Sequence, residues 1–95
     1  MSQKILVIGK SRDMIDLLIR LIHQLLYCEA IGVEDEKEAI QLLKQQYFHA
    51  VLVSSGIKEE ATLENNIYAC SPNTKVIYHF GGGSGLLKSE LMSIL

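Results

Sequence analysis

The stretch KILVIGKS at residues 4–11 decides the fold, because it runs from a buried strand directly into the start of a helix. Residues 5–8 are consecutive apolar residues, a pattern typical of parallel strands that are buried on both faces. Gly9 allows a tight turn, and Ser11 is a good N-cap for a helix that we expect to run to about Tyr27. A strand that leads at once into a helix is the opening unit of an α/β fold.

The rest of the chain repeats this alternation of strand and helix. Such alternation predicts right-handed crossovers and a parallel sheet with helices on both faces. The expected fold class is therefore α/β, a doubly wound parallel sheet of four strands, and residues 1–95 are expected to form a single domain. Further strands are predicted at residues 29–33, 50–53 and 75–80, and further helices at residues 34–46, 58–69 and 86–95.

Composition argues against several classes of protein. Of the 95 residues, 48% are hydrophobic and 21% are charged, as in compact globular domains rather than disordered chains. The net charge is −2 and the basic residues are scattered, which argues against a nucleic-acid partner. No apolar run is long enough to span a membrane. Cys28 and Cys70 form no metal-type pair, so we expect a cytoplasmic protein with reduced thiols.

Several segments resemble the receiver (CheY-like) domain of two-component response regulators. The resemblance spans nearly all residues up to about Phe80 and implies a flavodoxin-like fold. Receivers have the strand order 2-1-3-4-5; here the segment GGGSG at residues 81–85 stands in place of the fifth strand, so we expect the order 2-1-3-4. The resemblance rests on KILVI with DMIDLLIRLI for the first strand and helix, EAIGVEDEKEAIQLL for the second pair, FHAVLVSS for the third strand, and CSPNTKVIYHF for the fourth.

The reactive positions of receivers are not matched. Receivers carry an acidic pair after the first strand, where this chain has Gly9 and Lys10, and a phosphorylated Asp at the end of the third strand, where it has Ser54. Phe80 stands where receivers have Ser or Thr. Phosphoryl transfer to a carboxylate needs a divalent ion that oxygen ligands hold. We therefore predict a degenerate phosphoacceptor position at Ser54, with no enzymatic activity, no metal and no cofactor.

Binding of phosphate or a nucleotide is the alternative function. A Walker-type loop needs a glycine at the position that Lys4 occupies inside the strand, so the loop itself is missing. The glycine-rich segment 81–85 could instead present backbone N–H groups to an anion at the start of a helix. A simple connector in place of the lost strand is the competing interpretation. If an anion binds, its expected contacts are Lys10, Ser11, Gly81, Gly82, Gly83 and Ser84.

The first helix indicates a protein contact. Its apolar side chains cover more of its circumference than the arc of about 100° that one sheet face covers. The excess must pack on the last helix or on another chain, and a fourth strand without a fifth neighbour is an exposed edge. With the resemblance, this predicts a non-catalytic interaction module in signal transduction that binds a protein partner or forms a homodimer. The candidate interface residues are Ile19, Leu26, Tyr78 and Leu91.

Overall fold

Strands and helices alternate along the chain, as the sequence predicts. The structure is a computed structural model that describes residues 3–54 and 60–79. The predicted helix at residues 86–95 and the glycine-rich segment 81–85 lie outside these residues. In chain order the elements are β1 (Lys4–Ile8), α1 (Arg12–Leu26), β2 (Glu29–Val33), α2 (Glu36–Gln45), β3 (Ala50–Ser54), α3 (Glu60–Cys70) and β4 (Lys75–His79).

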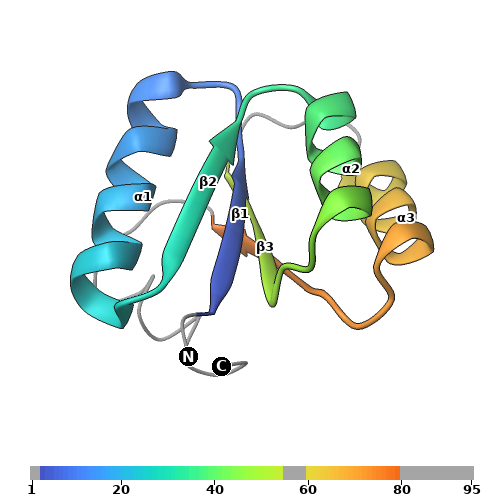
Figure 1. Ribbon diagram of the computed structural model, residues 1–95. Coiled ribbons are helices and arrows are strands. Elements are labelled where there is room, and N and C mark those ends of the chain that lie inside the picture. Colours follow the sequence, from blue (N-terminus) through green and yellow to red (C-terminus); the bar gives the residue numbers. More distant parts are fainter. Residues whose placement is uncertain (1–2, 55–59, 80–95) are drawn as a thin grey trace.

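The described strands form one parallel sheet in the order β2-β1-β3-β4, which confirms the predicted topology. β1 pairs with both β2 and β3, so that Ile5 lies between Ala30 and Ala50. One face of the sheet carries α1, and the other carries α2 and α3 (Figure 1). Because all strands run in the same direction, their carboxyl ends meet at the edge that is uppermost in Figure 1.

The apolar run of β1 is buried on both faces of the sheet. Ile5 and Val7 belong to the core under α1, whereas Leu6 and Ile8 belong to the core under α2 and α3. None of these side chains is exposed, and burying each one contributes about 1.5–3 kcal/mol relative to exposure. α1 completes the first core with Ile15, Leu18 and Ile22, and α2 and α3 complete the second with Ala39, Leu43, Leu63 and Ile67.

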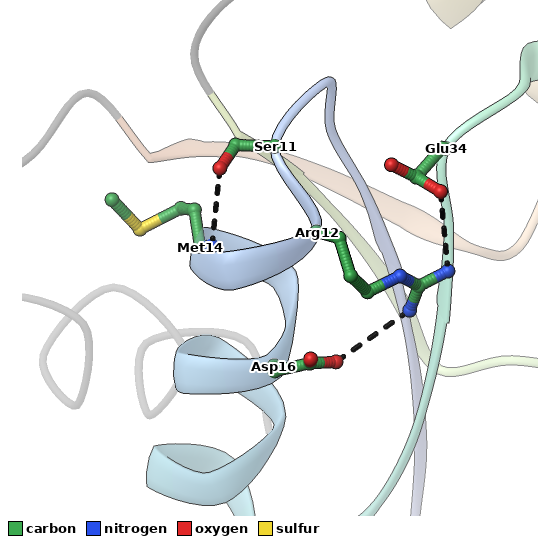
Figure 2. Close-up of polar contacts among 5 residues, drawn as sticks. All are labelled: Ser11, Arg12, Met14, Asp16 and Glu34. Carbon is green, nitrogen blue, oxygen red and sulfur yellow. Dashed lines mark hydrogen bonds and ion pairs between the residues drawn. The ribbon is translucent and has the colours of Figure 1, made fainter.

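Side-chain caps define where the first two helices begin. The Ser11 hydroxyl accepts a hydrogen bond from the Met14 N–H at 3.4 Å, as Figure 2 shows. A carboxylate oxygen of Asp35 accepts from the Lys37 N–H at 3.2 Å and caps α2 in the same way. Each cap satisfies a backbone donor that the helix itself leaves without a partner. The loops at the carboxyl ends of β1 and β2 are therefore short and fixed by local hydrogen bonds.

Gly32 allows α1 to approach β2 very closely. A Cβ atom at this position would lie 2.2 Å from Cγ2 of Ile15 and 2.8 Å from Cδ1 of Ile19. Both distances are far below van der Waals contact, so any larger residue would push α1 away from the sheet. A glycine within a strand pattern often marks such a close approach.

We predict that Gly32→Ala destabilises the domain by about 1–3 kcal/mol, because the added methyl group overpacks the contact between α1 and β2. For a domain of this size, each kcal/mol lowers the melting temperature by about 4–8 °C. Thermal unfolding followed by circular dichroism measures the effect. Gln41→Ala on the exposed surface of α2 is the control and should leave the melting temperature nearly unchanged. Equal melting temperatures of Gly32→Ala and wild type would contradict the close packing.

Candidate functional site

The carboxyl ends of the strands bring together the residues that the resemblance places in the reactive site. In open parallel sheets, ligands bind beyond these ends, where the winding direction of the chain changes. Here Gly9 and Lys10 follow β1, Glu34 and Asp35 follow β2, and Ser54 is the last residue of β3. This edge of the sheet is therefore the candidate site.

Gly9 and Ser54 pack directly against each other at this edge. Ser54 is only 5% exposed, and Gly9 is buried. A Cβ atom on Gly9 would lie 2.9 Å from Cβ of Ser54 and 3.3 Å from its Oγ. The backbone of Gly9 is also held in place, because its N–H donates to the Val33 carbonyl at 3.3 Å. The Ser54 side chain thus fills the space that a side chain at position 9 would need.

Charges of both signs surround this edge on the side of β1. Lys10 is exposed, and the Arg12 guanidinium lies 3.6 Å from a carboxylate oxygen of Asp16 and 3.6 Å from one of Glu34 (Figure 2). All three members of these ion pairs are about half exposed, so water screens the attraction and the contribution to stability is small. Their effect is geometric, because Arg12 links the start of α1 to the end of β2.

The structure brings together no ligand set for a metal among residues 3–54 and 60–79. In these ranges, no three His, Cys, Asp or Glu side chains lie close enough to hold a metal ion. Asp35, a carboxylate beside the site, caps α2 through the Lys37 N–H. The described part of the edge therefore offers a small neutral contact at Gly9 and Ser54, flanked by exposed charges of both signs.

The described cysteine thiols are not placed for nucleophilic chemistry at this edge. Cys28 is a buried thiol between α1 and β2 that forms no disulfide, and burial raises its pKa, which disfavours the reactive thiolate. Cys70 is a free, partly buried thiol that ends α3, and β4 leads from there toward the carboxyl edge. Both thiols therefore lie at the amino ends of the strands that follow them.

The predicted anion contacts are only partly within the described residues. Lys10 is exposed at the carboxyl edge, but the Ser11 hydroxyl is engaged as the N-cap of α1. Residues 81–84 lie outside the described residues. The anion site therefore stays a prediction.

The predicted interface residues lie in different environments. Ile19 is half-buried and packs against the core under α1, and Tyr78 is half-buried and its hydroxyl donates to a carboxylate oxygen of Glu64 at 2.8 Å. Leu26 is the last residue of α1, and Leu91 lies outside the described residues. On the outer surface of α1, Leu17 is instead the large apolar side chain with the greatest exposure, at 42%.

Sequence reasoning missed Gly32 and the Arg12–Glu34 contact. The glycine carried a signal, because an isolated glycine in a strand pattern suggests a bulge or a close approach of two segments. The ion pair carried none, because its two residues come from different elements and their spacing in the sequence says nothing about distance. Leu17 could have been found as the apolar residue that borders the polar stripe of the first helix.

Comparisons with known proteins agree on the fold. No family model matches the sequence, and no curated protein matches it. A two-component transcriptional regulator AraC from Clostridium phytofermentans ISDg superposes with a TM-score of 0.76 at 15% identity, covering 97% of this chain and 90% of that one. The chain has the flavodoxin-like receiver fold. A putative pilus assembly-related protein from Burkholderia pseudomallei K96243 superposes with a TM-score of 0.65 at 13% identity, covering 98% of this chain and 73% of that one.

We predict that Gly9→Ala destabilises the domain by about 1–2 kcal/mol, because the new methyl group meets the Ser54 side chain. Ser54→Gly removes the two Ser54 atoms that would lie closest to the methyl group and leaves only the ordinary contact with Cγ1 of Ile15 at 3.5 Å. The double variant Gly9→Ala/Ser54→Gly should therefore be more stable than the sum of the single effects predicts, with a coupling of at least about 0.5 kcal/mol. Urea unfolding of the four proteins measures this coupling. Strictly additive effects would mean that the two positions do not contact each other.

Proposed function

We propose that the chain is a non-catalytic pseudo-receiver domain that acts as a protein–protein interaction module in signal transduction. The observation that carries the proposal is the packing of Gly9 against Ser54 at the carboxyl edge of the sheet. This contact occupies the place where the resemblance puts an acidic residue and a phosphoacceptor.

The chemistry of phosphoryl transfer supports the proposal. A carboxylate acceptor needs a metal ion that bridges it to the phosphoryl oxygens and neutralises their charge. Gly9 supplies no ligand, Lys10 carries the wrong charge, and the hydroxyl of Ser54 cannot form an acyl phosphate. Restoring a carboxylate at position 9 would also force Ser54 to move, because even a Cβ atom comes within 2.9 Å of it. These positions therefore differ from the reactive site of receivers in both shape and charge.

The fold supports a place in signalling. One structural neighbour is a two-component transcriptional regulator, and the chain covers 90% of it. At 15% sequence identity, this similarity is evidence for the fold alone. Within the described residues, no helix has the length and apolar character needed to cross a bilayer. We place the domain in the cytoplasm, because it resembles receivers and its two cysteines form no disulfide.

Self-association is part of the proposal. α1 carries apolar side chains beyond those that face the core, and Leu17 is 42% exposed on its outer surface. Contiguous exposed apolar surface marks contacts between chains, whereas a single exposed side chain is ordinary, so the wide apolar arc of α1 carries this part of the proposal. Most soluble homo-oligomers are two-fold symmetric dimers, in which the same patch meets itself.

We predict that acetyl phosphate with Mg²⁺ leaves the mass of the intact protein unchanged, because the ligands and the acceptor carboxylate are absent. Electrospray mass spectrometry measures the result, and an active receiver domain in the same buffer is the positive control. A stable gain of one phosphoryl group would refute the pseudo-receiver.

We also predict a homodimer at micromolar concentration, which analytical ultracentrifugation detects as a concentration-dependent mass. Leu17→Glu should shift the protein toward the monomer without unfolding it, because the side chain is already largely in water. Tyr68→Glu on α3 is the matched control, since Tyr68 is similarly exposed at 38% and lies across the sheet from α1. A mass of one chain throughout the micromolar range, or equal effects of both variants, would refute a dimer through α1.

A further inference from the structure

The outer edge of β2 directs backbone groups away from the sheet. Within the described residues β2 pairs only with β1, at the end of the sheet (Figure 1). The Glu29 N–H donates to the Gln3 carbonyl at 2.9 Å, and the Val33 carbonyl accepts from the Gly9 N–H at 3.3 Å. Alternate residues of a strand direct their N–H and C=O groups to the same side. Ala30 and Gly32 therefore direct theirs outward, where an added strand would meet them.

The side chains along this edge leave it open to an added strand. Ile31 lies at the centre of β2 and is 36% exposed, although it is a large apolar residue. Gly32 has no side chain, and the space that a Cβ atom would take on this face of the sheet is filled by Ile15 and Ile19 of α1. β2 contains no lysine and no proline, the residues with which proteins commonly block such edges.

Carboxylates stand at both ends of the edge. Glu29 begins β2 and Glu34 follows it, and both are exposed. Glu29 makes no ion pair with any residue in ranges 3–54 and 60–79, and the Arg12–Glu34 pair is a long contact of half-exposed groups. A strand with basic residues near both ends would therefore find complementary charge on β2.

The same charges disfavour a second copy of this chain at the β2 edge. Two copies of β2 paired antiparallel about Ile31 would align Glu29 of one copy with Val33 of the other. Glu29 would then lie beside Glu34 of that copy at each end of the pair. The two side chains would project from opposite faces of the sheet, so their repulsion is a longer-range effect that salt weakens. Self-pairing would place like charges near each other at both ends, whereas a basic strand would place opposite charges there.

We propose that the outer edge of β2 binds an extended segment of a partner protein, whose apolar centre packs on Ile31 and whose flanking lysines or arginines face Glu29 and Glu34. This mode is β-strand addition, in which main-chain hydrogen bonds supply affinity and alternate side chains supply specificity. It rests on the proposed function as an interaction module and names a surface and a partner chemistry for it. The edge is short, so binding is weak, with a dissociation constant in the micromolar to millimolar range, and it weakens as salt is added.

The test uses a short capped peptide of central valines flanked on both sides by lysines, added to the ¹⁵N-labelled protein. Two-dimensional NMR should show shifts at Ala30, Ile31 and Gly32, and the amide hydrogens of Ala30 and Gly32 should exchange more slowly when the peptide is bound. The same peptide with alternate backbone nitrogens methylated keeps its charge and side chains but cannot pair along one edge. It should not protect these amides, and a peptide with glutamates in place of lysines should bind at least about tenfold more weakly.

Ile31→Lys tests the protein side of the contact, with Tyr68→Lys as the matched control of equal charge change and similar exposure, 36% against 38%. Ile31→Lys should weaken peptide binding about tenfold, and Tyr68→Lys should not. Equal effects of the two variants, equal binding of the methylated peptide, or no shift at Ala30 and Gly32 at millimolar peptide would overturn the proposal. So would protection of these two amides in the protein alone, which would mean that the edge is already occupied. None of these results bears on the acetyl phosphate experiment, whose outcome separately decides the non-catalytic function.

Discussion

The burial of β1 on both faces is the constraint on which the rest of the structure depends. Four fully buried apolar side chains in a row require a neighbouring strand on each side and a helical layer over each face. The sheet order and the two cores satisfy that requirement. They also fix where β1 ends, so that Gly9 emerges between the ends of β2 and β3, next to the Val33 carbonyl and the Ser54 side chain. The geometry of the candidate site is thus a consequence of the core.

The sequence was sufficient for the fold because the deciding features are local. The apolar run of β1, the cap at Ser11 and the alternation of elements each act over a few residues, and together they leave few topologies. Contacts between helices and strands could not be predicted from the sequence. The apolar arc of α1 is too wide to define how the helix is rotated over the sheet, so the pattern could not show that Ile19 packs on the core while Leu17 faces water. The residues of the reactive edge were identified by resemblance, whereas their packing required the structure.

Gly9 and Ser54 also determine the electrostatic character of the centre of this edge. A cluster of carboxylates is destabilising unless a cation neutralises it, because like charges at close range cannot all stay ionised without cost. Gly9 and Ser54 replace that repulsion with a neutral van der Waals contact between buried groups. Such an edge needs no ion for its stability. The proposed protein contacts lie on the outer surfaces of the domain rather than at this contact.

Those surfaces include the edges of the sheet, because the described helices cover its two faces. Along an edge, the outer strand itself determines what can bind. An open edge is a hazard, because it accepts any extended chain, including another copy of the same protein. At β2, Glu29 and Glu34 are exposed, and no proline interrupts the backbone, which could otherwise block pairing. Gly32 lets α1 pack closely on one face of the strand, where Ile15 and Ile19 fill the space of a side chain. The packing of α1 therefore fixes one face of β2, and the proposed binding of a basic strand depends on the backbone and the charges along its outer edge.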